Sequence, residues 1–226
     1  MTLNYQDYIL LIFNCVKYRH KALNQKSSWL QELSALKNKD RITYFHVLGN
    51  PDLEQDFLID NEEQILWIKV NDDYNSLPKK VIQALEAVTK SFYFKYIFKT
   101  DDDQMVSPVK FFDTLITVLD NKYSAPVFSN RVHYGGHIVD VKQPYNSLYY
   151  KLHPELPLDL IVNVTQYCSG RFYLLSHNVV DFLLIKKEAI SKEFLEDYAI
   201  GYHMPTRIFK DKIMKIETDK YFKDFD

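Results

Sequence analysis

The chain is organised around residues 96–105, which read Y-I-F-K-T-D-D-D-Q-M. A run of β-branched and aromatic residues that ends abruptly in three carboxylates is typical of a buried strand that reaches the edge of a binding site. Residues 106–119 then predict a helix, with Ser107 as its cap and Pro108 in its first position. We therefore expect the acidic cluster to lie in a strand-to-helix turn.

The three aspartates of this turn are Asp101, Asp102 and Asp103. Adjacent carboxylates repel one another unless a cation lies between them or water screens them. Hard carboxylate oxygens suit Mg²⁺ or Mn²⁺, ions that commonly connect a protein to the phosphates of a nucleotide. The alternative is a solvated acidic turn at a helix N-terminus, where negative charge is favoured without any ligand.

Strand and helix patterns alternate through the first half of the chain, which predicts a mostly parallel α/β sheet. In such sheets ligands bind outside the carboxyl ends of the strands, and the aspartates lie at such an end. We expect His46 to be a hydrogen-bonded core histidine inside the second strand. The predicted strands are residues 8–13, 42–48 and 65–70, and the predicted helices are 22–36, 52–64 (solvated) and 77–88.

The pattern changes after residue 119. Residues 125–139 contain candidate strands with a turn at Gly135 and Gly136, and residues 143–163, rich in Tyr and Pro, predict an extended, irregular wall. Residues 172–185 predict a strand followed by a helix that Ser176 caps. A second acidic pair, Glu196 and Asp197, lies in an apolar context. Because no repeat or linker divides the chain, we expect one domain over residues 1–226.

Composition excludes several classes of protein. The 226 residues are 46% hydrophobic and 26% charged, with a formal net charge of −2, so no basic footprint for nucleic acid is present. Two cysteines are too few for a disulfide framework. We expect a cytoplasmic protein, because no apolar run approaches about 18 residues and the start lacks a secretory signal. Residues 210–225 suit either a peripheral membrane contact or a final strand and solvated tail.

Four stretches, in this order, resemble the β-1,3-galactosyltransferase-like family of inverting, nucleotide-sugar-dependent glycosyltransferases, which includes galactosyl-, N-acetylglucosaminyl- and Fringe-like transferases. The resemblance implies a GT-A fold, a Rossmann-like and mostly parallel central sheet flanked by helices. It implies a nucleotide-sugar-binding half over about residues 1–120 and an acceptor-binding half over about 121–226. The stretches are K-S-S-W at 26–29, D-D-Y-N-S-L at 72–77 with Lys80, F-K-T-D-D-D at 98–103, and Y-C-S-G at 167–170 through Ser176 with E-D-Y-A-I-G at 196–201.

The resemblance also implies roles for individual residues. Asp101 and Asp103, with Asp102 between them, resemble the D-x-D motif that holds a divalent cation against the donor diphosphate. Asp197 resembles the catalytic base, and Glu196 a residue that orients it or binds sugar hydroxyls; without the resemblance this pair would be interpreted as a helix cap. Lys80 resembles a lysine near the donor. The donor-sugar and acceptor pocket is implied at Tyr167, Ser169, Gly170 and Arg171.

The chain departs from the family pattern at three places. Lys26 stands where the family usually has Arg, and Arg171 stands where a small residue is common. The family often supplies a metal-binding His well after the Glu-Asp pair, whereas here the last histidine is His203, six positions beyond Asp197. We therefore consider His203 as the third ligand, with Asp219, Asp224 or water as substitutes.

These observations predict an inverting, metal-dependent transferase. It would move a hexose (galactose, glucose or an N-acetylhexosamine) from a UDP-sugar to a hydroxyl of a glycan, glycolipid or glycoprotein, with a β-1,3 linkage and Mn²⁺ or Mg²⁺. One alternative is a catalytically silent carbohydrate-binding domain. The other is a metal-dependent nucleotidyltransferase, for which a Gly-rich phosphate loop would be expected and is not found.

Overall fold

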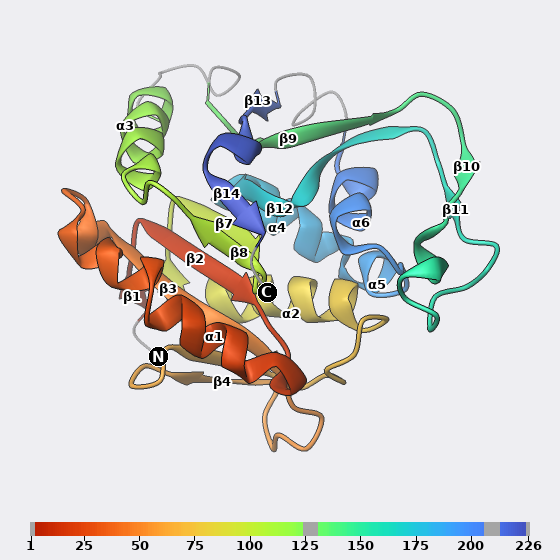
Figure 1. The fold of residues 1–226 in the computed structure, drawn as a ribbon, viewed down its shortest axis with the longest axis horizontal. Coiled ribbons are helices and arrows are strands. Elements are labelled where there is room, and N and C mark those ends of the chain that lie inside the picture. The colour runs from red at the N-terminus through yellow and green to blue at the C-terminus, as the bar shows by residue number, and fades with distance from the viewer. Residues whose placement is uncertain (1–2, 124–130, 206–212, 225–226) are drawn as a thin grey trace.

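The computed structural model describes residues 3–123, 131–205 and 213–224. Its centre is an eight-stranded mixed sheet with the order β13-β9-β12-β7-β2-β3-β5-β4 (Figure 1). Strands β7, β2, β3 and β5 run parallel to one another, while β12, next to β7, and β4, next to β5, run antiparallel. The expected α/β architecture with a parallel central block is confirmed.

Helices and short strand pairs surround this sheet. The sheet contains β2 (Tyr8–Phe13), β3 (Ile42–Gly49), β4 (Phe57–Asp60), β5 (Ile65–Ile68), β7 (Tyr96–Asp101), β9 (Tyr134–Val141), β12 (Thr165–Ser176) and β13 (Met214–Lys215). The helices are α1 (Arg19–Lys26), α2 (Leu77–Ser91), α3 (Phe111–Tyr123), α4 (His177–Ile185), α5 (Lys187–Ile190) and α6 (Glu196–His203). Three strand pairs complete the fold: β1 (Asn4–Tyr5) with β6 (Phe92–Tyr93), β8 (Gln104–Val106) with β14 (Phe222–Asp224), and β10 (Tyr145–Asn146) with β11 (Ile161–Val162).

Strand β2 separates two hydrophobic layers. Its alternate side chains Ile9 and Leu11 join the buried cluster formed with α2, α4 and α6, whereas Leu10 and Ile12 join the cluster formed with α3 and the 3₁₀ turn Trp29–Ala35. This arrangement follows from the two-residue period of a strand, which sends successive side chains to opposite faces. Both faces are apolar, as expected for a strand that helices cover on both sides.

Two of the predicted helices in the first half are wrong. The helix expected over 22–36 ends at Lys26 and continues as a 3₁₀ turn, because the Ser28 hydroxyl donates to the Asn24 carbonyl (2.6 Å) at the end of α1. The stretch 52–64 contains β4, which adds to the sheet edge beside β5. There the Asp60 carboxylate accepts hydrogen bonds from the Glu62 and Glu63 amides, so its charge stabilises a turn.

The acidic cluster does not precede a helix directly. Residues 104–106 form β8, which pairs with β14 near the end of the chain, and α3 begins only at Phe111. The bond between Ser107 and Pro108 is cis, and these residues lie before the helix rather than at its first turn. Asp101 to Asp103 therefore turn from one strand into another. The pairing of β8 with β14 joins distant parts of the chain, which local sequence signals do not report.

The expected turn at Gly135 and Gly136 is also wrong, because both glycines lie inside β9. A Cβ atom on Gly136 would lie 2.7 Å from the Cβ of Cys168 on β12, which is too close for any other residue. The glycines thus permit close approach of backbones where the register with β12 shifts. Residues 124–130, part of the same predicted region, lie outside the described residues.

Later predictions agree better with the structure. Strand β12 leads into α4, and the Ser176 hydroxyl accepts from the Val179 amide, which confirms the cap. The stretch 143–163 is irregular, with only β10, β11 and a 3₁₀ turn at Tyr149–Lys151. The final strand expected within 210–225 is β14; residues 206–212 and 225–226 lie outside the described residues. None of the helices in the described ranges is both long and apolar enough to cross a membrane.

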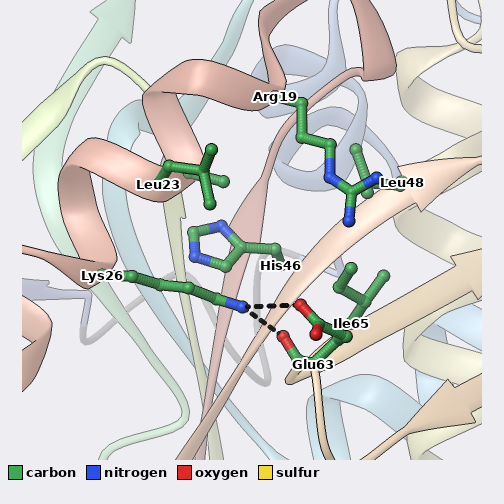
Figure 2. A pocket seen from close by; sticks show the side chains of 8 residues that line it. Arg19, Leu23, Lys26, His46, Leu48, Glu63 and Ile65 are labelled. Carbon is green, nitrogen blue, oxygen red and sulfur yellow. Dashed lines mark hydrogen bonds and ion pairs between the residues drawn. The ribbon is translucent and has the colours of Figure 1, made fainter.

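His46 is a core residue, but the expected hydrogen bond is missing. The side chain is 1% exposed, and neither ring nitrogen has a partner in the described parts of the chain. Figure 2 shows the ring between the side chains of Leu23 and Lys26 of α1, in a small cavity where the Lys26 ammonium reaches the carboxylate of Glu63 (3.6 Å). Burial, with a contribution from the Lys26 charge, lowers the pKa of His46 to about 3.

This depressed pKa predicts acid sensitivity. The unfolded chain binds a proton at His46 below about pH 6.5 and the folded chain does not, so stability is complete above that pH and is lost as the pH falls toward 3. Between pH 7 and pH 4.5 the free energy of unfolding of the wild-type protein should fall. We expect this fall to be about 2 to 3 kcal/mol smaller in His46→Leu, measured by urea titration at both pH values. Equal slopes for wild type and His46→Leu would contradict the assignment.

Candidate active site

The acidic cluster lies at the carboxyl end of β7, beside the carboxyl ends of the parallel strands β2 and β3. The Gln25 side chain of α1 holds the turn by donating to the carbonyls of Asp101 (3.3 Å) and Gln104 (2.9 Å). Burial raises the pKa of Asp101 to about 6 and that of Asp102 to about 7, with their acidic neighbours contributing. The cluster is therefore partly desolvated rather than a solvated turn.

A buried ammonium group joins this turn to the second acidic pair. The Lys99 side chain is 2% exposed, and its Nζ lies 2.7 Å from Oδ1 of Asp101 and 3.0 Å from Oε2 of Glu196. It also donates to the carbonyl of Gly170 (2.9 Å). Burial alone would lower the pKa of Lys99, but the two carboxylates raise it above its ordinary value. One lysine thus holds together β7, β12 and α6.

Glu196 is a structural partner of this lysine. It is buried, its Oε1 accepts from the Tyr173 hydroxyl, and its Oε2 faces Lys99. Both oxygens are therefore occupied by protein groups. Burial raises the pKa of Glu196, and Lys99 opposes that shift. Two roles were considered for Glu196, the orientation of Asp197 and contact with sugar hydroxyls. The hydrogen bonds to Tyr173 and Lys99 favour the first role.

Asp197 occupies a more open position at the first turn of α6. Its Oδ2 accepts from the Gly170 amide (2.9 Å) and its Oδ1 from the Tyr198 amide (2.7 Å), while the side chain stays partly exposed. Burial raises the pKa of Asp197, although Lys99 and the two amides counteract this effect. A carboxylate that is fixed by backbone amides and still reaches solvent can accept a proton from a bound molecule.

Gly170 of β12 lies close to three charged groups of the site. A Cβ atom there would lie 3.2 Å from Nζ of Lys99, 3.4 Å from Oδ2 of Asp101 and 3.6 Å from Oδ2 of Asp197. The glycine leaves the place between the two aspartates free of a side chain, and we call this place the cradle. Ser169 lies on the same strand, where its pairing with β9 is interrupted, and Tyr167 lies just before this interruption, paired with Val139 of β9.

Arg171 points to the C-terminal segment. Its guanidinium contacts Asp219 (2.6 Å) and both carboxylate oxygens of Asp224 (3.0 Å each). Asp224 also accepts from the Gln104 amide group (2.7 Å), which donates at the same time to Asp103 (2.9 Å). The side chain of Arg171 therefore forms salt bridges within the protein, and it secures β14 beside the aspartate turn.

Lys80 lies below the adjoining loops rather than in an open pocket. It is buried, and its Nζ contacts the carbonyl of Asn14 and Oδ1 of Asp72, both at 2.7 Å. The Asp72 carboxylate also accepts from the amides of Val16 (2.6 Å) and Gly49 (2.9 Å). This pair connects the loops that follow β2, β3 and β5. Lys80 therefore has a structural role: it holds these loops together at the carboxyl ends of the strands.

A divalent cation fits the aspartate turn only with help from other ligands. Oδ2 of Asp101 makes no hydrogen bond within the described residues and faces the open cradle at Gly170. However, no three His, Cys, Asp or Glu side chains in the described ranges are grouped closely enough to hold a metal ion. Such a turn suits an ion of the Mg²⁺ type, which commonly binds one or two carboxylates and completes its shell with phosphate and water.

Contrary to the expectation for His203, the described part of the chain does not group this residue with Asp101 and Asp103 as a third ligand. His203 is the last residue of α6, about 9 Å along the helix axis from Asp197, and its Nε2 pairs with Glu193 (2.8 Å). Of the substitutes, Asp224 is linked to Asp103 through Gln104, whereas Asp219 contacts Arg171.

The comparison with family models agrees with this site. The model described as Galactosyltransferase matches residues 20–222, which is 203 of the 226 residues and includes the aspartate turn, Gly170 and α6. The chain belongs to the galactosyltransferase family. A search of curated proteins found no match. Membership supports a glycosyltransferase with a nucleotide-sugar donor and a glycan acceptor, and the mixed α/β architecture is consistent with the GT-A fold.

Sequence reasoning missed several residues of this galactosyltransferase-family site. Lys99 received no role, although a lysine inside an apolar strand is unusual enough to suggest a buried ion pair. Tyr173 and Gln25 show no local signal, because their partners are distant in the sequence. Asn14, at the carboxyl end of β2, is buried with neither side-chain atom hydrogen-bonded in the described residues. An amide left unpaired at this edge of the sheet suggests that a polar ligand is its partner.

A larger side chain at position 170 should strongly reduce activity. We expect Gly170→Val to lower kcat/KM by about 100-fold, because the new methyl groups would displace Lys99, Asp101 or Asp197 from their present positions. Because Lys99 is buried, its displacement should also lower the melting temperature, so kcat/KM is measured at a temperature at which circular dichroism shows the variant to be folded. Wild-type kcat/KM in a folded Gly170→Val protein would show that the cradle does not receive substrate.

Proposed function

We propose that the chain is a single GT-A domain that transfers a hexose from a UDP-sugar to a hydroxyl group of a glycan acceptor, with inversion at the anomeric carbon and with Mn²⁺ or Mg²⁺. The observation that carries the proposal is the opposition, across Gly170, of the Asp101 and Asp197 carboxylates. The first lies on the strand edge where nucleotides bind in parallel sheets, and the second is a fixed, partly exposed base.

In this proposal Asp197 takes the proton of the acceptor hydroxyl. The acceptor oxygen forms a bond to the anomeric carbon while the bond from that carbon to the diphosphate oxygen breaks, and the electron pair leaves with UDP. Attack from the face opposite the leaving group inverts the configuration. Lys99 and Glu196 hold Asp101 and the first turn of α6 at a fixed separation. A positioned base of this kind contributes roughly 10² to 10⁴ in rate.

Asp103 and Asp101 would hold the divalent ion, which supplies positive charge to the departing diphosphate when it is bound. Asn14 and the loops tied by Asp72 and Lys80 would face the nucleoside, since they lie at the carboxyl ends of the neighbouring strands. A β-1,3 linkage and a cytoplasmic location also belong to the proposal, on the ground of the family resemblance and the sequence composition.

Calorimetric titration tests the donor site. We expect UDP to bind with Mn²⁺ present, to bind much more weakly without it, and to lose at least about tenfold in affinity in Asp103→Ala. Asp181→Ala on α4 is the matched control, because that aspartate lies on the helix that follows the opposite end of β12. A panel of UDP-sugars then identifies the transferred sugar. Absence of UDP binding to the wild-type protein, with and without Mn²⁺, would contradict the proposal.

A silent carbohydrate-binding domain is the second candidate. The exposed rings of Tyr145 and Tyr149, near the acceptor side of the site, favour it, because aromatic faces pack against the apolar faces of sugars. The intact arrangement of Asp101, Lys99 and Asp197 favours the transferase. Release of UDP from a UDP-sugar, measured with the wild-type protein and acceptor, distinguishes the two.

A further inference from the structure

An irregular lobe extends from the sheet next to α6. We call it the β10–β11 lobe and define it as residues 143–164, which contain the two-stranded pair β10 and β11 and the 3₁₀ turn Tyr149–Lys151. Figure 1 shows β10 and β11 at the side of the molecule, beyond α6. The sequence predicts only an irregular wall here and assigns no role to its individual residues.

Packing holds the lobe against the candidate base. Leu156 and Val162 of the lobe are buried in one cluster with Leu195 and Tyr198, the residues on either side of the Glu196–Asp197 pair. The Asn163 amide also donates to the Tyr198 hydroxyl (3.1 Å). The position of the lobe relative to Asp197 is therefore determined by a small hydrophobic core of its own.

The lobe connects to the donor side as well. The His153 ring stacks on Tyr74 with centroids 3.7 Å apart, and the Asn75 side chain donates to the carbonyl of Glu155 (3.0 Å). Tyr74 and Asn75 precede α2, beside the ion pair of Asp72 and Lys80. The lobe thus spans from the loop before α2 to the first turn of α6, across the acceptor side of the candidate site.

Several large aliphatic side chains of the lobe are exposed to solvent. Leu148 and Leu152, which flank the 3₁₀ turn, are 58% and 75% exposed. Single exposed leucines are ordinary on a protein surface, but a series of them in one short segment usually marks an interaction site. The large exposed aliphatic side chains of the lobe are Leu148, Leu152, Leu158, Ile161 and Val164.

Tyr149 connects this apolar surface to the site. It lies on the same turn as the two leucines, in the lobe that packs against the residues on either side of the Glu196–Asp197 pair, and burial together with the Asp197 carboxylate raises the pKa of its hydroxyl. A half-exposed aromatic ring beside a base can pack against the apolar face of a sugar ring. A glycoside whose sugar lies over Tyr149 would place its aglycone, the group attached at the anomeric carbon, next to Leu148 and Leu152.

We propose that the β10–β11 lobe binds the apolar aglycone of a lipid-linked acceptor, with Leu148 and Leu152 in contact with the alkyl chain. The inference rests on the proposed function, because it assigns the acceptor class of the same site. The exposed charges of the lobe and its border are mixed, with Lys142 and Lys151 opposed by Glu155 and Asp159. An anionic bilayer attracts clusters of basic residues, so this mixture favours an individual acyl or alkyl chain over a membrane surface.

Methyl and octyl glycosides of galactose, glucose and N-acetylglucosamine are suitable probes below the micellar concentration. NMR titration, with and without UDP and Mn²⁺, measures their affinity even if no transfer occurs. We expect each octyl glycoside that binds to bind about 10-fold more tightly than its methyl counterpart, because part of the chain leaves water. In the double variant Leu148→Ser/Leu152→Ser, the octyl glycoside should bind at most about twofold more tightly than the methyl glycoside. The affinity for the methyl glycoside should be unchanged.

Two further variants separate the contributions. Tyr149→Ala should weaken methyl and octyl glycosides by the same factor, since it removes the sugar contact alone. Leu23→Ser on α1 matches the exposure of Leu148 (57% against 58%) and should keep the wild-type octyl preference. Circular dichroism confirms that the variants are folded.

The outcomes are distinguishable. An octyl preference that persists in Leu148→Ser/Leu152→Ser overturns the inference, as does the lack of any octyl preference in a protein that binds UDP. If the double variant instead loses a dimer seen by light scattering, or loses binding to phosphatidylcholine vesicles, with an unchanged octyl preference, the lobe contacts a second copy or a bilayer. Failure of the wild-type protein to bind UDP contradicts the proposed function separately.

Discussion

Asp197→Asn is expected to lower turnover by about 100-fold or more while the affinity for UDP stays close to that of the wild-type protein. The substitution keeps the size of the side chain, and its carboxamide oxygen can still accept the hydrogen bond from the Gly170 amide. It removes the ability to take a proton from the acceptor hydroxyl. It also replaces the oxygen that accepts from the Tyr198 amide with an NH₂ group, so that hydrogen bond is lost. Steady-state kinetics with the identified UDP-sugar, together with calorimetry of UDP, measure the two effects separately.

Asp181→Asn is the matched control, because Asp181 lies on α4 with its carboxylate near His177 (3.1 Å) and outside the site. The pH profile offers a second test. Burial raises the pKa of Asp197, so the acidic limb of kcat/KM in the wild-type enzyme should lie above the pH at which an ordinary aspartate titrates. Near wild-type turnover of Asp197→Asn would show that another group is the base.

Lys99→Met should destabilise the fold more than any other single substitution discussed above. It leaves Asp101 and Glu196 buried without the ammonium that lies 2.7 and 3.0 Å from them. Removal of one partner from a buried ion pair typically costs about 3 to 5 kcal/mol. Since both acids would then have raised pKa values in the folded state, the loss of stability should grow as the pH rises and the carboxylates ionise. Urea unfolding at pH 5 and pH 8 measures this.

The double variant Lys99→Met/Glu196→Gln tests the reason for the loss. Neutralising Glu196 removes one of the two uncompensated charges, so part of the stability should return, whereas Glu196→Gln alone should be destabilising. Lys187→Met is the control for a partly exposed pair, since Lys187 contacts Glu86 with both side chains partly in water, and its expected cost is about 0 to 1 kcal/mol. Equal costs for Lys99→Met and Lys187→Met would rule out a central role for the buried lysine.

The sequence alone determined the central strands and the position of the acidic cluster. Residues 8–13 and 96–98 are apolar on both faces, and such runs form buried strands wherever helices cover the sheet. The order of the motifs was also enough to indicate the family, because its signals are local and occur in a fixed order along the chain. The Ser176 cap was predictable for the same reason, since a cap involves only neighbouring residues.

Tertiary structure decided everything that depends on distant partners. Residues 104–106 became a strand because β14 pairs with them. Gly135 and Gly136 lie within a strand because β13 approaches the first closely and β12 the second. The ion pair of Lys99 with Asp101 and Glu196 joins three separate elements, so no local spacing predicts it. Local propensity and hydrophobic period act over a few residues, whereas pairing across a sheet and the pairing of buried charges depend on contacts that only the folded chain creates.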